Sequence, residues 1–133
     1  MRLRRLTIAL LPLASAVAGL GVSQAASAQV VDHYCQRPTG DYCTAVLKQH
    51  GRIKLSLSAF SFRGRYQVCV DGPRSSGKVC HRGRLSRHHG VYADKIDWAK
   101  HFPHRAKGRY KVSWRKAGGQ LGRQLSFHWG GFG

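Results

Sequence analysis

Carboxylates are scarce in this sequence, and the two that lie closest together are the first candidates for acid–base chemistry. The chain has only five acidic residues, all of them Asp, and Asp94 and Asp97 form the near pair. Hydrolysis by a general acid and a general base needs two carboxyl groups in different environments, and Trp98 beside Asp97 could raise one pKa. An exposed Asp that pairs with Lys95 or Lys100 is the simpler interpretation. No catalytic residue is therefore predicted, and the chain is not expected to be an enzyme.

Two pairs of histidines could contribute to a metal site. They are His88 with His89, and His101 with His104. Imidazole is a common ligand of transition metals, but such sites usually add Cys or carboxylate ligands. The cysteines are expected in disulfides, and neighbouring arginines would repel a cation. We interpret these histidines as exposed loop residues and predict no metal site and no other cofactor.

The four cysteines are better suited to disulfide bonds than to catalysis or metal binding. The sequence has no C-x-x-C spacing and no G-x-S-x-G motif, and an even number of cysteines in a small exported chain is typical of a disulfide framework. Facing positions of an antiparallel hairpin are close enough to be bridged. We therefore predict the pairs Cys35–Cys43 and Cys69–Cys80.

Basic residues are the strongest functional signal of this sequence. Lys and Arg number 23, and the formal net charge is +18. In the segment after Gly108, cations alternate with apolar residues, so they would share the outer face of a strand. A basic sheet face could follow a phosphate backbone and bind it in a salt-dependent way. The predicted polyanion-binding residues are Arg63, Arg65, Arg82, Arg84, Arg87, Arg109, Lys111 and Arg115.

A second interpretation of this charge stays open. Arginine, glycine and alanine are favoured by a GC-rich genome, and a basic surface also keeps a secreted domain soluble. Lys and Arg on an outer strand face also protect exposed edges from aggregation. We interpret Trp114, Phe127 and Trp129 as core residues rather than as a platform for stacking bases.

The N-terminal residues have the pattern of a secretory signal peptide. Arg2, Arg4 and Arg5 precede an apolar stretch that runs from Leu6 to about residue 22, and small residues follow up to Ala28. We expect residues 1–28 to be a signal peptide and residues 29–133 to be a single secreted domain. A membrane anchor is disfavoured because the apolar run is short. The arginine pair leaves the twin-arginine route open beside the general secretory route.

Alternating apolar and polar residues predict about six strands. Ile53–Phe62 is the clearest of them, and Tyr66–Val70 and Lys78–His81 are expected to form a hairpin. In that hairpin Cys69 would face Cys80. The segment Gly83–Gly90 is interpreted as basic and irregular.

The remaining segments support an all-β fold without a long helix. Thr44–Gln49 fits a short strand or one helical turn, and that choice stays open. Val91–Ile96 is interpreted as a strand, followed by a turn or a short 3₁₀ piece at Trp98–Lys100. Short strands separated by turns are typical of a β-sandwich, with a small closed barrel as the alternative.

The last two strands are predicted to close the fold as a hairpin. Apolar and polar residues alternate in Gly108–Trp114 and again in Leu125–Trp129, with Gly118 and Gly119 between them. One register places all the large apolar side chains on a single face, with the tip near Gly119 and Gln120. The predicted facing pairs are Trp114 with Leu125, Val112 with Phe127, and Tyr110 with Trp129.

The segment from Phe102 and Pro103 through Gly108–Trp114 resembles immunoglobulin-like and fibronectin type III-like domains. Those domains carry a Tyr at the start of the penultimate strand whose hydroxyl bonds back to the preceding corner, and Tyr110 matches it. Val112 occupies the place of the second core Cys of antibody domains. The resemblance implies an immunoglobulin-like antiparallel β-sandwich.

Two further resemblances concern secreted proteins. The chain is similar to short secreted proteins of actinobacteria, a resemblance that implies no particular activity. Its ending is also similar to the copper-resistance β-sandwich family of the periplasm. That family binds copper through an N-terminal His and an Asp-Gly-His segment in the last hairpin, and both features are missing here. Copper binding is therefore not expected.

These observations predict a secreted, non-enzymatic binding module with an anionic partner. A cell-wall polymer, an anionic lipid surface and extracellular DNA all fit the charge. The alternative is a protein-interaction or toxin-like module whose partner is a specific protein and whose charge is incidental. No small-molecule substrate is indicated, and the oligomeric state is left open.

Overall fold

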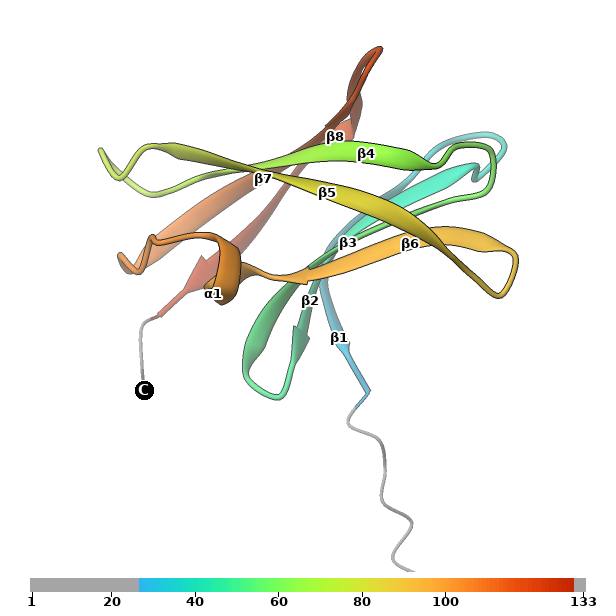
Figure 1. Ribbon diagram of the computed structural model, residues 1–133. Helices are drawn as coiled ribbons and strands as arrows, with labels where there is room; N and C mark the ends of the chain where they lie inside the picture. Colours follow the sequence, from blue (N-terminus) through green and yellow to red (C-terminus); the bar gives the residue numbers. More distant parts are fainter. Residues whose placement is uncertain (1–26, 131–133) are drawn as a thin grey trace, which may run out of the picture.

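The computed structural model describes residues 27–130, which fold into eight strands and one short helix (Figure 1). The expected signal peptide lies outside the described residues except for Ser27 and Ala28. The elements are β1 (Gln29–Cys35), β2 (Tyr42–Gln49), β3 (Arg52–Ala59), β4 (Gly64–Asp71), β5 (Lys78–His88), β6 (Val91–Asp97), α1 (Trp98–His101), β7 (Gly108–Lys116) and β8 (Gly119–Trp129). Within residues 27–130, no helix has the length and apolar character needed to cross a membrane.

All strand pairs are antiparallel, and the strands join in one sheet of order β1-β2-β3-β6-β5-β4-β7-β8. This sheet curls until its edge strands β1 and β8 lie side by side, so it is nearly closed and barrel-like (Figure 1). The all-β antiparallel class is confirmed. The two separate sheets of an immunoglobulin-like sandwich are not confirmed, because β5 joins both halves of the structure.

Strand β5 forms the corner between two half-sheets. Its first part pairs with β4, up to Leu85 opposite Gly64. Its last three residues pair with β6, from Ser86 opposite Ala93 to His88 opposite Val91. We call β1, β2, β3 and β6 the first half, and β5, β4, β7 and β8 the second half. A strand that changes partners in this way turns one sheet over onto the other.

The core fills the space between the two halves. The apolar residues that alternate along β3 form its inner face, since Ile53, Leu55 and Leu57 are buried. Trp98 of α1 lies at the centre of an aromatic cluster, with its ring centroid 5.1 Å from Tyr110 and from Phe127 and 5.2 Å from Trp129. Such edge-to-face contacts add to the free energy gained from burying the rings.

Both predicted disulfides are confirmed, and each lies within one half. Cys35–Cys43 joins β1 to β2, and Cys69–Cys80 joins β4 to β5. The predicted β4–β5 register is also confirmed, with Cys69 opposite Cys80. Two facing cysteines in an alternating hairpin leave only one register that brings the sulfur atoms together.

The prediction of an irregular segment at Gly83–Gly90 was wrong, because β5 continues to His88. A Cβ on Gly83 would lie only 2.4 Å from the Tyr66 ring of β4. Glycine is therefore the residue that lets β5 cross this ring. It is a requirement for close approach inside a strand rather than a turn signal. The segment Thr44–Gln49, left undecided above, is part of strand β2.

The predicted register of the closing hairpin was wrong by two residues. Tyr110 lies opposite Phe127 rather than Trp129, and Val112 lies opposite Leu125. Trp114 then pairs with Leu121, because β8 carries extra residues at Gly122–Gln124. Such a bulge bends the strand and redirects its side chains. The turn is formed by residues 117 and 118, between Lys116 and Gly119.

Candidate functional site

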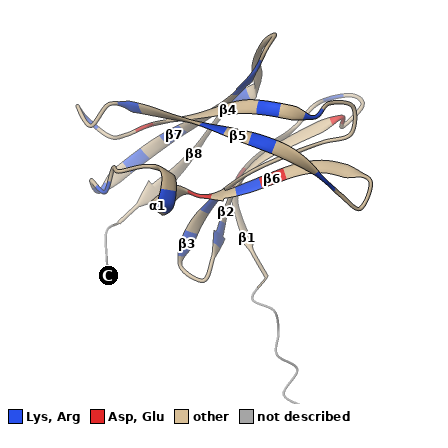
Figure 2. Cartoon of the chain, in the orientation of Figure 1, with Lys and Arg blue, Asp and Glu red and all other residues tan. Residues whose placement is uncertain are grey.

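Six of the eight predicted polyanion-binding residues lie together on the outer face of the second half. The inner face of these strands is apolar, so alternation directs their cations to solvent. Figure 2 shows Lys and Arg on β4, β5 and β7, with few acidic residues among them. We call this surface the basic face. Its members are Arg65, Arg82, Arg84, Arg109, Lys111 and Arg115, all exposed.

The strand register sets the spacing of this charge. Arg65 lies opposite Arg84, while Gln67 has Arg82 on one side and Arg115 on the other. Neighbouring strands are about 4.8 Å apart, and residues two positions apart on one strand are separated by about 7 Å. The charges therefore form a two-dimensional array rather than a single row. Such an array can contact several anionic groups of one polymer.

A shallow hollow of about 380 Å³ lies within the basic face. Gln67, Arg65, Arg82 and Arg115 line it together with Lys116. The Lys116 ammonium lies 3.4 Å from the Arg65 carbonyl oxygen and 5.5 Å from the centre of the Phe62 ring. These contacts hold a fourth cation beside the three arginines.

No member of the basic face forms an ion pair with a carboxylate of residues 27–130. The ion pairs of residues 27–130 involve Arg52, Lys54 and Arg123, none of which belongs to this face. Asp71 is the acidic residue of these outer strands, and it lies between Lys78 and Lys111. Clustered cations that far outnumber the acidic residues around them raise the local positive potential and attract polyanions.

Arg63 and Arg87 are not part of the basic face. Arg63 precedes β4 in the loop after β3, and Arg87 pairs with Tyr92 where β5 has already joined the first half. Sequence alternation did not show that β5 changes partners between Leu85 and Ser86. The structure therefore separates Arg87 from Arg82 and Arg84, which precede it on the same strand.

The near carboxylates Asp94 and Asp97 both make structural bonds. The Tyr66 hydroxyl donates a hydrogen bond of 2.8 Å to Asp94. Burial, followed by this bonded carboxylate, raises the pKa of Tyr66 well above its ordinary value. Asp94 therefore holds the Tyr66 ring in place. Gly83, which lies between Arg82 and Arg84 of the basic face, crosses this ring.

Asp97 caps α1 and lies almost fully buried. Its carboxylate accepts hydrogen bonds from the Ala99 backbone N–H at 3.0 Å, from Lys54 at 3.1 Å and from Arg52 at 3.3 Å. Burial would raise the pKa of Asp97, but hydrogen bonds from Lys54, Ala99 and Arg52 outweigh it and hold the pKa below 3.8. The group is an ionised helix cap.

The two histidine pairs do not come together, because they flank opposite ends of β6. His88 bonds Ser86 near the β5–β6 turn, whereas His101 packs against His81 in a tilted arrangement with ring centroids 4.1 Å apart. His104 contacts the Ser76 carbonyl oxygen. No group of three or more His, Cys, Asp or Glu side chains in residues 27–130 is arranged to hold a metal ion.

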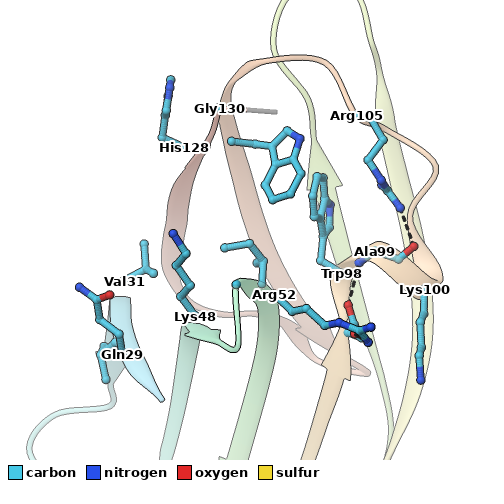
Figure 3. A pocket seen from close by; sticks show the side chains of 15 residues that line it. Gln29, Val31, Lys48, Arg52, Trp98, Ala99, Lys100, Arg105, His128 and Gly130 are labelled. Carbon is cyan, nitrogen blue, oxygen red and sulfur yellow. Dashed lines mark hydrogen bonds and ion pairs between the residues drawn. The ribbon is translucent and has the colours of Figure 1, made fainter. Parts of the chain in front are cut away.

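Sequence reasoning missed a second recessed surface, a cleft at the end of the barrel-like sheet (Figure 3). Its volume is about 1150 Å³. It is bordered by the start of β1, the β2–β3 turn, α1 and the end of β8. These segments are distant in the sequence, and no motif marks any of them. Only the curling of the sheet brings them together.

Comparisons with known proteins give little further information. No protein-family model matches this chain, and no curated protein matches its sequence. A solved structure titled "Crystal structure of Br derivative BhCBM56" is similar, with 13% sequence identity and a TM-score of 0.40. The similarity covers 73% of this chain and 98% of that one. A likeness of this degree says nothing about what the present chain binds.

Proposed function

We propose that this protein is an extracellular, non-catalytic binding module that holds an anionic polymer against its basic face. One observation carries the proposal. Six exposed cations share one face of the second half, and none of them is in an ion pair with a carboxylate of residues 27–130. Extracellular location is part of the proposal, since two disulfides are typical of an oxidising compartment.

The shape of the face favours an extended polymer over a compact ion. The face spans β5, β4 and β7, and its charges recur at about 7 Å along a strand. A polymer with closely spaced phosphate or carboxylate groups can contact several cations at once and release several counterions on binding. Duplex DNA, a wall teichoic acid and an anionic lipid surface are the three candidates to compare.

The test is a binding titration of the purified, oxidised protein at several salt concentrations. If all six cations of the basic face contact the polymer, the slope of log K against log salt for duplex DNA should be about −5. The substitutions Arg65→Gln, Arg82→Gln and Arg115→Gln, made together, should reduce that slope by about 3 in magnitude, because three phosphate contacts are lost.

A matched control removes the same charge elsewhere. The substitutions Arg37→Gln, Arg74→Gln and Lys95→Gln, made together, change exposed residues outside the basic face. This control should keep the wild-type slope. Equal slopes for both triple variants would show that only net charge matters. Weak binding to all three polymers that disappears at physiological salt would contradict the proposal and direct the search to a protein partner.

A further inference from the structure

The cleft at the end of the sheet combines an apolar lining with uncompensated positive charge. Two of the three large hydrophobic residues that are exposed within residues 27–130 lie on it, Val30 at 54% and Val31 at 42% exposure. The half-buried Trp129 adds aromatic surface beside them, and the buried Trp98 lies beneath it. Exposed apolar residues that gather around one hollow are typical of a binding surface.

The positive charge comes from both sides of the cleft. In Figure 3, Trp98 lies between Lys48 on one side and Lys100 and Arg105 on the other. The two lysines are exposed and belong to no ion pair of the described residues.

Arg105 is held in place without losing its charge. Its guanidinium donates to the carbonyl oxygens of Phe102, His104 and Ala99, and its Cζ lies 4.8 Å from the centre of the Trp98 ring. None of these partners is a carboxylate. The one carboxylate that borders the cleft within residues 27–130, Asp97, is occupied by Lys54, Arg52 and the Ala99 N–H.

These observations identify the chemistry of a matching ligand. An inorganic anion would leave Val30, Val31 and Trp129 uncovered, and a neutral apolar molecule would leave the cations unpaired. We propose that the cleft binds one molecule of an anionic amphiphile, with its carboxylate, sulfate or phosphate group paired with a lysine at one side of the cleft, Lys48 or Lys100, and its apolar body on the valines and Trp129. The volume of about 1150 Å³ is ample for such a ligand, since pockets for small ligands usually measure about 300–1,000 Å³.

This inference does not depend on the polymer-binding function, because the basic face and the cleft have no residue in common. Octyl sulfate, below its micelle-forming concentration, is the main probe. Octanol lacks the anion, and inorganic sulfate lacks the apolar body. Isothermal titration calorimetry gives the affinities, and a change in intrinsic fluorescence reports on Trp98 and Trp129 at the cleft, against the constant contribution of the buried Trp114. Octyl sulfate should bind with one molecule per chain, more tightly than octanol and far more tightly than sulfate.

The variant Lys48→Gln with Lys100→Gln tests the charged side of the cleft. Both residues are exposed, so the fold should be retained. Octyl sulfate should bind this variant about tenfold more weakly, which corresponds to roughly 1.4 kcal/mol, while octanol binding stays unchanged. Replacement of Trp129 by Leu should weaken both octyl sulfate and octanol, because it removes apolar contact rather than charge.

Two controls separate this site from the rest of the surface. The pair Arg37→Gln with Lys95→Gln removes the same charge outside the cleft, and the triple variant of the basic face removes charge from the polymer site. Both should bind octyl sulfate as the wild type does. Absence of octyl sulfate binding, or an equal loss in the cleft and control pairs, would overturn the inference. Loss in the basic-face variant alone would place the amphiphile on that face instead.

Discussion

The Asp32 carboxylate of β1 receives two hydrogen bonds from the Arg123 guanidinium of β8, at 2.7 and 3.2 Å. The same carboxylate also accepts the Ser126 backbone N–H at 3.0 Å. These edge strands have no backbone ladder between them. One acidic side chain therefore links the two edge strands, together with the Arg123 guanidinium, which also donates to the His33 carbonyl oxygen at 2.9 Å. The β8 bulge at Gly122–Gln124 carries Arg123 to this position.

Replacement of Asp32 by Ala should open this junction. Loss of the acceptor for Ser126 and Arg123 should lower the free energy of unfolding by about 1 kcal/mol, a modest value because the bonds are partly exposed. Hydrogen exchange should show faster exchange of the Ser126 amide. In a double-mutant cycle with Arg123→Gln, the two effects should not add. Additive losses would mean that the pair is not coupled.

Replacement of Tyr110 by Phe should remove one buried hydrogen bond. The hydroxyl donates to the Ala106 carbonyl oxygen at 2.7 Å, as the resemblance to a tyrosine corner implied. We expect a loss of about 1 kcal/mol in denaturant unfolding. Tyr92→Phe is the matched control, because no hydrogen bond of its hydroxyl is found within residues 27–130. Equal effects of the two substitutions would assign the loss to something other than this bond.

Replacement of Trp114 by Ala should cost roughly 3–5 kcal/mol, the usual range for a large aromatic residue in a core. Trp114 is fully buried on the inner face of β7. The loss should appear as a lower denaturant midpoint. Arg115→Ala, on the outer face of the same strand, should leave the midpoint nearly unchanged. A small effect of Trp114→Ala would contradict the inner face assigned to β7.

Stability should fall as pH falls through 6.5, because of His81. Burial, followed by the nearby His101 of α1, lowers the pKa of His81 below 6.5, although Asp94 of β6 opposes the shift. The unfolded chain therefore binds a proton at a higher pH than the folded chain does. The stabilisation that depends on neutral His81 is fully present above pH 6.5. It is lost as the pH falls toward the lowered pKa of His81 in the folded state. Unfolding free energies measured across this range should show the loss.

The variant His81→Gln should flatten that part of the profile, whereas His33→Gln, on the exposed surface of β1, should not. Asp32 acts in a separate and more acidic range. Its bonds with Arg123 hold its pKa below 3.8, so its stabilisation is present above that value and is lost as pH falls further. A profile that stays steep near 6.5 in His81→Gln would assign the effect to another group.

Alternation in the sequence predicted which residues face the core, but it could not predict every register. In the closing hairpin a shift of two residues leaves Tyr110, Val112, Leu125 and Phe127 on the same inner face. Both registers therefore satisfy the same apolar pattern. The β8 bulge depends on Gly122, whose added Cβ would lie 2.3 Å from the Tyr34 ring of β1, and this contact is distant in the sequence. In the β4–β5 hairpin, by contrast, the two facing cysteines removed the ambiguity.

The two candidate sites also differ in how far the sequence could predict them. The basic face could be predicted, because its members alternate with apolar residues within single strands and pairing only assembles them. The separation of Arg87 from Arg82 and Arg84 could not be predicted, because the corner in β5 has no local signal. The cleft could not be predicted from the sequence, because its cations and indoles come from separate elements, chiefly β2, α1 and β8. Only closure of the sheet brings these elements together at one end.

The placement of the two disulfides has a mechanical consequence. Cys35–Cys43 lies within the first half and Cys69–Cys80 within the second, so no disulfide of the described residues crosses from one half to the other. A force that separates the halves would meet the three β5–β6 pairs, the Tyr66–Asp94 hydrogen bond, the bonds between β1 and β8 around Asp32 and Arg123, and the core between the halves. Each half would then stay cross-linked as it swung away. The intact disulfides would thus limit the unfolding of the β1–β2 and β4–β5 hairpins, but they would not hold the two halves together.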